Sequence, residues 1–551
     1  MEGAKDGQSA VGNMQSAQAI GQSARPEGTR NGQSVIAIVR SVRQACIGNR
    51  QSGFGGRLEV RRVLGAAVVG ALLGTGPLGA LAQDGGAAGA SATVMKGKAP
   101  VTKKLLVVKL PKPKSFTLSN GLTVYVLEDH RFPAVRMRLQ MHAGSLFEPK
   151  PGVAEMTASM LTEGTKTRSS LQLAQETADL GASLGASSGA DTASLSVAGL
   201  SETTDTLIGL MADVLLNPNF SAERLDRMKF QQVSGIAQRR SSPAAMTADL
   251  ASKVYYGGTP YGKPSAKETE INAIAGDDLA SFHDAFYRPN GAILGVSGDV
   301  DTKMLKVKLE TALAAWKAAS QTPDLPKADF KSHEATKIFL VDRPGSAQTV
   351  LQFGNLAIKQ SDPDYIPLVI ANRILGGGSS GRLFQNIREQ KGYTYGAYSS
   401  LSGGRWPGIW GAGASVRTPV TEPAVREFFH EFDRLQDTPV SETDLERAKR
   451  SIVGGFAMTL ESPDSILNRT LELVQNGLPL DYWDTYPAKI QAVTAVDVRR
   501  VAQKYLGKNR IQLIAVGERS QIEAGLKKFG PVEIVDASEL GGGGGRGGRR
   551  R

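Results

Sequence analysis

The sequence predicts an α+β fold made of two homologous sandwich domains in tandem. The chain has 551 residues, more than a single hydrophobic core usually supports. Segments that alternate like strands are interleaved with segments of helical periodicity. One group of residues also recurs at a constant spacing: Ser221, Leu225, Arg227 and Lys229 return as Ser441, Leu445, Arg447 and Lys449. A repeat this long indicates two copies of one domain rather than a short-repeat solenoid.

The individual elements follow from local periodicity. A hairpin is predicted around the Asn120-Gly121 turn, because this dipeptide separates two alternating apolar runs. The other predictions for the first copy are strands over 134–142 and 192–200 and helices over 152–161, 170–184 and 202–216. In both copies a helix ending near Tyr287 or Tyr505 precedes a β-rich run, over 292–296 and 511–516.

Composition sets the predicted boundaries. Residues 1–82 are predicted to be a disordered N-terminus followed by a signal peptide, and 83–112 a Gly-, Ala-, Lys- and Pro-rich linker. The two domains are expected over 113–320 and 332–535. Residues 536–551 are predicted to be a disordered tail rich in Gly and Arg.

A secretory signal is predicted from three features in order. Arg61 and Arg62 precede an apolar run over 63–81, and an Ala-x-Ala site ends at Ala82. Cleavage there would give a periplasmic or secreted chain. The alternative is a membrane anchor over 63–82, but Gly and Pro residues interrupt this short run. The only cysteine, Cys46, lies upstream, so the exported chain would carry no thiol.

The net charge of +12 does not indicate nucleic-acid binding. Residues 1–85 carry nine Lys and Arg against five Asp and Glu, and residues 541–551 add four Arg. Only +4 therefore remains for the region between them, which is nearly balanced. The tail has no aromatic residue on which a base could stack.

Several short strings, in their order and spacing, resemble the M16 (insulinase, pitrilysin and mitochondrial processing peptidase-like) zinc peptidases. They are Asn120-Gly121-Leu122, Ala143-Gly144-Ser145, Gly152-Val153-Ala154, Glu163-Gly164-Thr165, Tyr287-Arg288-Pro289-Asn290, Gly298-Asp299-Val300 and the run from Gly381 to Glu389. The resemblance covers essentially all of 113–530. It implies two homologous M16/LuxS-metallohydrolase-like domains, which pair with two more around an extended peptide.

The resemblance also locates a zinc motif that this chain lacks. Active members carry His-x-x-Glu-His on the helix that follows the Gly-x-Ala string, with two imidazoles on one helical face and a Glu as general base. Here Glu155, Ala158 and Ser159 occupy those positions. The family's third ligand falls near Ser234 or Gly235, where no carboxylate stands. We therefore predict no metal and no catalytic residue in this degenerate motif.

No other residues form an evident replacement for the zinc ligands. No two of the histidines have the spacing of a helical ligand pair; they are His130, His142, His283, His333 and His430. We expect His142 to be a core or edge residue and His430 to lie on a helix surface among acids. Ser159 has no base nearby in sequence and is predicted to pack the helix.

The second copy keeps a different family feature. In M16 enzymes this half presents an Arg and a Tyr, seven positions apart, to peptide held at zinc. Arg388 and Tyr395 match that spacing, with Tyr393 as a competitor for the Tyr role. Both side chains donate hydrogen bonds, as a developing oxyanion requires. The alternative is structural: Arg388 paired with an acid and Tyr395 packed in the sheet.

The glycine-rich stretch Gly376–Gly381 does not indicate a nucleotide site. It lacks the Lys-Ser/Thr that completes a phosphate-binding loop, and helical residues precede it. In the M16 resemblance it is a flexible loop before the helix that carries Arg388.

Together these features predict a zinc-less, non-catalytic M16 subunit that is inactive alone. It would bind peptide by strand addition and supply Arg388 and Tyr395 to a catalytic partner with an intact zinc motif, as a heterodimer or else in a homodimer. The chain itself would hold no cofactor, with zinc in the partner. One alternative is a non-enzymatic peptide-binding or scaffolding protein. Another is a metalloendopeptidase with unorthodox ligands.

Overall fold

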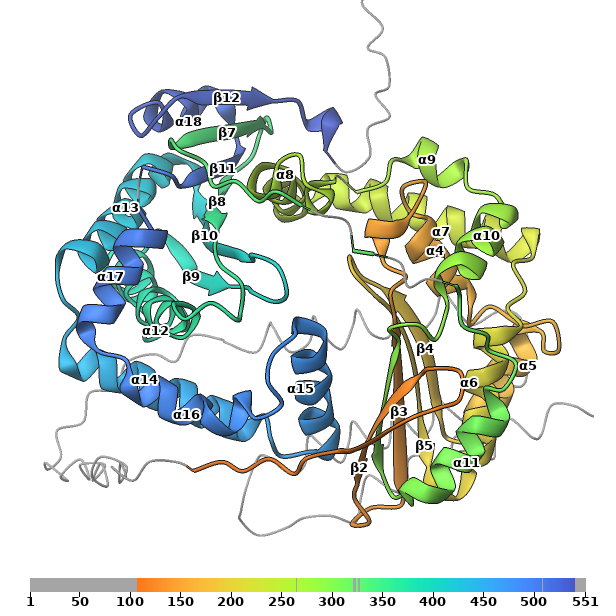
Figure 1. Cartoon of the computed structure of the whole chain (residues 1–551). Coiled ribbons are helices and arrows are strands. Elements are labelled where there is room, and N and C mark those ends of the chain that lie inside the picture. Colours follow the sequence, from red (N-terminus) through yellow and green to blue (C-terminus); the bar gives the residue numbers. More distant parts are fainter. Residues whose placement is uncertain (1–106, 264, 321–323, 326–327, 508, 541–551) are drawn as a thin grey trace, which may run out of the picture. The chain divides into compact units, whose positions relative to one another are not determined.

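The computed structural model describes residues 107–540, apart from residues 264, 321–323, 326–327 and 508 (Figure 1). The predicted signal peptide, most of the linker and the Gly/Arg run from 541 lie outside these residues, so export and the alternative anchor over 63–82 stay predictions. Among the described helices, none is both long and apolar enough to cross a membrane.

The first copy builds a mixed six-stranded sheet in the order β1-β2-β6-β3-β5-β4. Strands β2 and β6 run parallel, and all other neighbours are antiparallel. The strands are β1 Lys114–Thr117, β2 Thr123–Glu128, β3 Ala134–Met141, β4 Ser183–Ser188, β5 Ala193–Leu200 and β6 Ile293–Gly298. Both β1 and β4 are therefore edge strands.

Helices of the first copy cover one face of this sheet (Figure 1). They are α4 Val153–Met160, α5 Ser170–Asp179, α6 Thr204–Leu216, α7 Ala222–Ser241, α9 Glu268–Asn272, α10 Gly276–Phe286 and α11 Thr302–Ala312. The alternation of β3 explains the packing: Val135, Met137 and Leu139 are buried towards the helices, whereas Arg136 and Arg138 face the other way.

The second copy repeats the arrangement in the order β12-β7-β11-β8-β10-β9. Its strands are β7 Lys337–Asp342, β8 Gln348–Leu356, β9 Thr394–Leu401, β10 Ile409–Arg417, β11 Gln512–Gly517 and β12 Val532–Val535. Its helices are α12 Tyr365–Leu375, α13 Thr421–Asp437, α14 Glu442–Met458, α16 Tyr482–Ala492, α17 Ala495–Tyr505 and α18 Arg519–Leu526. The copies differ at one edge, where β12 comes from the end of the chain and pairs parallel to β7.

These two sheets confirm the predicted tandem α+β fold. One predicted element is wrong in extent: the helix expected over 170–184 ends at Asp179, and β4 begins at Ser183. The chain turns at Gly181, whose φ of +58° favours glycine. Helical periodicity continued past this point by chance, because Leu180 and Leu184 fit both patterns.

One helix of each copy packs on the sheet of the other copy. Helix α8, Pro243–Tyr256, lies on β8 and β11, and helix α15, Pro463–Asn476, lies on β2 and β6 (Figure 1). Both begin after a serine N-cap, Ser242 or Ser462, whose side chain accepts an amide proton. The two helices are thus equivalent elements of the duplication.

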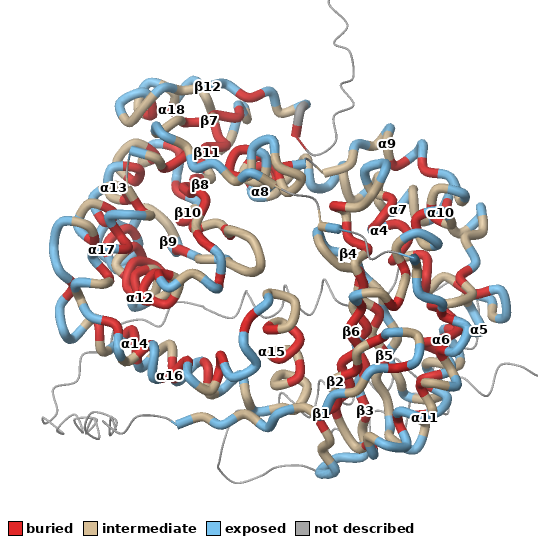
Figure 2. The backbone as a smooth tube through the Cα atoms, in the orientation of Figure 1, coloured by how far each residue is buried: buried red, intermediate tan, exposed pale blue. Residues whose placement is uncertain are grey.

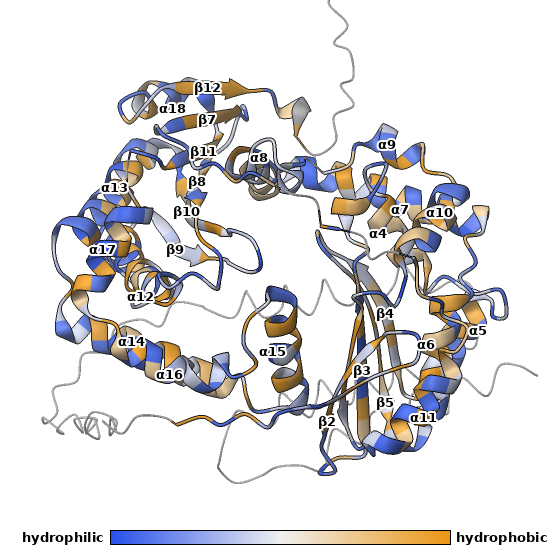
Figure 3. Ribbon diagram, viewed as in Figure 1, coloured by the Kyte–Doolittle hydropathy of each residue, from blue (hydrophilic) through white to orange (hydrophobic). Residues whose placement is uncertain are grey.

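The hydrophobic cores reflect the packing of α8 and α15 on the sheet of the other copy. Each sheet has a large core on its own helical face, and buried residues concentrate there (Figure 2). Two smaller clusters join the copies. In one, Tyr255 and Leu250 of α8 pack on Val516; in the other, Leu467 and Leu471 of α15 pack on Ile293. Hydrophobic residues on α15 and along the strands of the first sheet are visible in Figure 3.

A carboxylate anchors the start of α12, the helix that leads to the glycine-rich loop. Asp364 accepts hydrogen bonds from Arg500 (2.6 Å), Lys504 (3.0 Å) and Tyr505 (2.8 Å). Burial opposes ionisation of Asp364, but the three donors outweigh it and hold its pKa at about 2. The ionised carboxylate therefore stabilises the native fold.

Replacing Asp364 by asparagine is expected to lower the free energy of unfolding by about 2 kcal/mol at neutral pH. Because the native pKa is depressed, this stabilisation is present above the unfolded pKa of about 4 and is lost as pH falls through about 2. Urea unfolding across a pH series measures it, with Asp226→Asn, an exposed carboxylate on α7, as control. An unchanged gap between wild type and Asp364→Asn at low pH would contradict this account.

Candidate functional site

Helix α4 carries the three residues at the zinc-motif positions. It begins after Gly152, and the Glu148 carboxylate accepts the amide proton of Ala154 at 3.0 Å. Burial raises the pKa of Glu148, an effect that this backbone hydrogen bond partly offsets. The Glu148 carboxyl group therefore caps the N-terminus of α4.

The three positions meet different surroundings. Glu155 is exposed and lines a pocket, Ala158 is buried with 1% exposure, and Ser159 is half-buried. The Ser159 carbonyl accepts a hydrogen bond from the Thr162 hydroxyl, and its own side chain does not line the pocket. Only Glu155 thus presents a donor atom where two imidazoles would be needed.

The pocket beside Glu155 has a volume of about 420 Å³ and lies between α4, α7 and the edge strand β4. Helix α7 contributes Gln232, Gly235 and Ile236. Ser234 points elsewhere, because its hydroxyl bonds to the Phe230 carbonyl. The family's third ligand is expected near Ser234 or Gly235. Only Gly235 lines the pocket beside Glu155, and glycine has no side chain that could bind a metal.

This set of side chains does not fit a catalytic zinc ion, which takes three protein ligands. The cations Arg239 and Lys263 also line the pocket and would repel a metal ion. Within the described ranges, no group of three or more His, Cys, Asp or Glu residues could hold a metal. These residues therefore cannot hold a zinc ion that would catalyse peptide hydrolysis.

Four histidines have ordinary structural surroundings. His130 bonds to Asp299 at 2.6 Å, His283 and His333 bond to the carbonyls of Leu215 and Val254, and His430 is exposed on α13. His142 differs, because its Nδ1 atom is buried without a hydrogen-bond partner. His142 lies half-buried directly after β3, and the cavity beside it supplies no donor to its Nδ1 atom.

Arg388 lies on a π-helical segment, η4, Phe384–Gln390. Such segments are rare and occur frequently at functional sites. Asn386, on the buried face of η4, donates hydrogen bonds to the carboxylates of Glu427 and Glu431 on α13, at 2.9 Å each. These bonds attach η4 to α13. Arg388 projects outwards over the Phe384 ring, 4.6 Å from its centroid, and only a 3.5 Å contact joins it to Glu389.

Tyr395 lies on β9, one of the two edge strands of the second sheet, and is 88% exposed. Tyr393, the competitor, packs against the core instead. The segment η4 packs on β9 through Phe384 and Tyr398, with ring centroids 5.6 Å apart. Arg388 and Tyr395 therefore come from two neighbouring elements, and each keeps donor atoms towards solvent.

The glycine-rich loop is held by its carbonyl groups. The Gly376 carbonyl accepts the Ser399 amide proton at 2.9 Å, Arg373 donates to Gly377, and Gln385 donates to Ser379 at 2.7 Å. These contacts fasten the loop to β9 and η4. The amides of Gly376, Gly377 and Gly381 donate to carbonyl groups, so the loop does not present a row of free amides to a phosphate.

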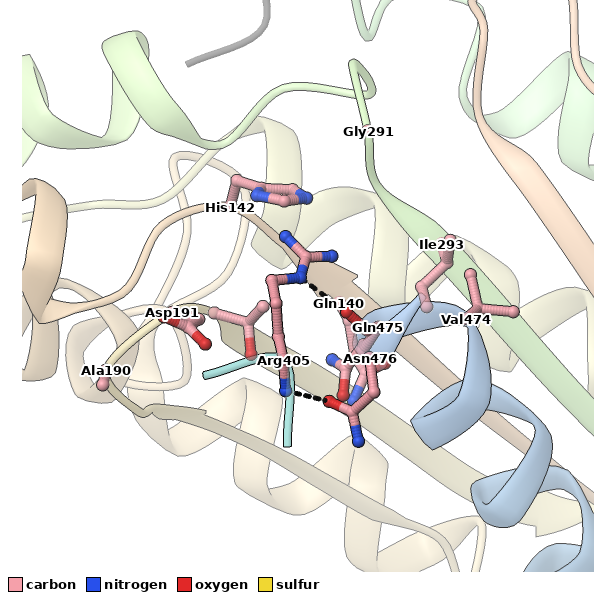
Figure 4. A pocket seen from close by; sticks show the side chains of 11 residues that line it. Gln140, His142, Ala190, Asp191, Gly291, Ile293, Arg405, Val474, Gln475 and Asn476 are labelled. Carbon is pink, nitrogen blue, oxygen red and sulfur yellow. Dashed lines mark hydrogen bonds between the residues drawn. The ribbon is translucent and has the colours of Figure 1, made fainter. Parts of the chain in front are cut away.

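Sequence reasoning missed a second pocket, of about 240 Å³, on the opposite face of the first sheet (Figure 4). Its polar residues are Gln140, His142, Asp191, Thr192, Arg405, Gln475 and Asn476. They lie far apart along the chain, and only the packing of α15 on the first sheet brings them together. A residue-by-residue comparison of the two copies was the one signal that could have found it.

Known protein families match both halves of the chain. The family described as insulinase (peptidase family M16) matches residues 123–268, and the peptidase M16 inactive domain matches residues 273–452. An uncharacterized zinc protease, YmxG, from Bacillus subtilis is 24% identical over 70% of this chain and 93% of its own length. A protein named non-peptidase homolog YmxG, from Helicobacter pylori, is 23% identical over 72% and 91%.

Solved structures agree with these matches. The crystal structure of a peptidase M16 inactive domain from Pseudomonas fluorescens is 26% identical, with a TM-score of 0.67, over 74% of this chain and 98% of that one. A protease from Helicobacter pylori, at 19% identity and a TM-score of 0.68, shares the fold over 74% and 100%. The resemblance seen in the sequence is confirmed, and the chain belongs to peptidase family M16.

Proposed function

We propose that this chain is the zinc-less subunit of a two-chain M16 peptidase. It binds peptide and supplies Arg388 and Tyr395 to a zinc site carried by its partner. The observation that supports this most directly is a contrast between the copies. The zinc-motif positions hold Glu155, Ala158 and Ser159, whereas Arg388 and Tyr395 are both exposed.

The chemistry of the pair suits this role. Hydrolysis of a peptide turns a carbonyl oxygen into an oxyanion, which fixed hydrogen-bond donors stabilise. The Arg388 guanidinium is always charged and the Tyr395 hydroxyl is a neutral donor. The packed η4 segment and the β9 ladder hold the two backbones in place. A partner's zinc would supply the activated water.

Peptide binding has an available template. The edge strand β4 borders the pocket beside Glu155, and its residues alternate between exposed and half-buried. An extended peptide adds to such an edge through main-chain hydrogen bonds. The leader over 61–82 further suggests that the complex works in the periplasm or outside the cell.

The test is reconstitution. The purified chain alone is expected to retain no stoichiometric zinc by mass spectrometry and to cleave no unfolded peptide. Addition of an M16 chain with an intact His-x-x-Glu-His motif should produce chelator-sensitive cleavage at a one-to-one ratio. Chelator-sensitive cleavage by this chain alone would overturn the proposal and favour the metallopeptidase with unorthodox ligands.

A non-enzymatic peptide-binding or scaffolding role is the second candidate. The relative from Helicobacter pylori named a non-peptidase homolog favours it. If a complex forms but Arg388→Ala and Tyr395→Phe both leave its activity unchanged, the scaffolding role is the better account.

A further inference from the structure

The second pocket lies on the face of the first sheet that α15 covers (Figure 4). Gln140 and His142 come from β3 and the residue that follows it, and Asp191 from the turn between β4 and β5. The second copy contributes Arg405, from the loop between β9 and β10, and Asn476, at the end of α15. The pocket thus exists only where the two copies meet.

The duplication explains why this space is open. Ile293 and Gln512 begin the equivalent strands β6 and β11; Ile293 pairs with Gln140, and Gln512 pairs with Gly354. Gln140 and Gly354 are therefore equivalent positions.

The helices above them align through their N-caps and through Gly257 and Gly477, which makes Tyr255 and Gln475 equivalent. In the second copy the Tyr255 ring fills the space over Gly354, so closely that a Cβ there would lie 2.7 Å from Cζ. In the first copy the shorter Gln475 leaves that space empty and Gln140 makes it polar.

The Arg405 side chain lines this pocket, and its guanidinium group has no ion-pair partner among the described residues. Its Nε atom donates to the Gln475 carbonyl at 2.7 Å, and its backbone amide donates to Asn476 Oδ1 at 3.1 Å. These contacts hold the side chain, but across the described residues no partner is found for its two terminal nitrogens. A half-buried guanidinium of this kind suits a carboxylate, which it binds with two parallel hydrogen bonds.

Other residues that line the pocket supply hydrogen-bond acceptors. Asp191 accepts one hydrogen bond, from the Tyr261 hydroxyl at 2.5 Å, and no ion pair within 4.0 Å joins it to Arg405 in the described part of the chain. Gln140 Oε1 and His142 Nδ1 are buried without a donor. Burial lowers the pKa of His142, so its imidazole stays neutral and Nδ1 can accept a proton donor.

We propose that this pocket binds a free aliphatic α-amino acid. The carboxylate pairs with Arg405, and the ammonium group donates to Asp191 and to His142 or Gln140. Ile293 and Val474 supply an apolar wall for the side chain. Pockets for drug-sized ligands have volumes of roughly 300–1,000 Å³. This pocket, at about 240 Å³, is smaller and so suits a ligand the size of an amino acid. The site does not depend on the peptidase partner.

Calorimetric titration of the full chain with L-alanine, L-valine, L-leucine and L-isoleucine tests the proposal. At least one is expected to bind, and its amide and its N-acetyl derivative should each bind about tenfold or more weakly, because each lacks one charge. If none of the four binds at about 10 mM, or if both derivatives bind as well as the parent, the proposal is wrong.

Two variants locate the site. Arg405→Ala is expected to weaken binding by about 10- to 100-fold, whereas Arg138→Ala, on the same face of β3 but outside the pocket, should leave it unchanged. The double variant Gln140→Gly and Gln475→Tyr recreates both the glycine and the ring of the other copy, so it should fill the cavity and abolish binding. Unaltered affinity in a folded double variant would overturn the assignment of the site.

Discussion

Replacing Arg388 by alanine is expected to lower the turnover number of the reconstituted two-chain peptidase by about 100- to 1,000-fold. The guanidinium would act mainly on charge that develops in the transition state, so kcat should fall much more than KM changes. Arg388 is 44% exposed, so the substitution should leave the melting temperature unchanged. Steady-state kinetics on an unfolded peptide measure the effect.

The matched control for this substitution is Arg426→Ala on α13, an exposed arginine paired with Glu422. For Tyr395→Phe, which removes only the hydroxyl donor, the control is Tyr398→Phe on the same strand. We expect a smaller loss of kcat for Tyr395→Phe than for Arg388→Ala, and none for either control. Equal losses in test and control variants would show that the pair acts only through structure.

Replacing Tyr255 by alanine is expected to lower the free energy of unfolding by about 3–5 kcal/mol. The ring is 2% exposed and packs between α8 and the second sheet, where no other side chain can fill its place over Gly354. Denaturant unfolding monitored by circular dichroism measures the loss.

Tyr255→Phe separates packing from hydrogen bonding at this position. It removes only the hydroxyl, whose hydrogen bond to the Gln352 carbonyl is long at 3.4 Å, and should cost no more than about 1 kcal/mol. If phenylalanine destabilised the fold as much as alanine, the packing explanation would be wrong.

Local pattern predicted most of the elements. The hairpin at Asn120-Gly121, the strand over 134–142 and the helix over 202–216 follow from periodicities that burial imposes, and the structure has all three. The end of α5 was missed because Gly181 and the next strand continue an apolar spacing that also fits a helix. Pairing of β12 with β7 was not foreseen, because no local signal specifies a parallel partner almost 200 residues away.

The site residues also fall into those that local sequence predicts and those that depend on tertiary structure. Glu155, Ala158 and Ser159 could be located because the family motif is local, and so could Arg388 and Tyr395. Tyr393 packs inwards and Tyr395 points outwards because Tyr393 lies in the bend before β9 begins at Thr394, and the sequence alone left the start of this strand open. The amino-acid pocket needs the cross-packing of α15, a tertiary contact that no local motif specifies and that only a comparison of the two copies could have indicated.

That cross-packing has a wider consequence. Because α8 and α15 each cover the partner copy's sheet, neither copy is a self-contained module. Without the second copy, Ile293 and Tyr125 of the first sheet would be exposed to water. Without the first copy, Val516 and Val350 of the second sheet would be exposed. Each copy therefore needs the other to cover one face of its sheet, and the contacts of α8 and α15 constrain the residues on those faces. Residues outside these contacts, such as those at the zinc-motif positions, are not under this constraint.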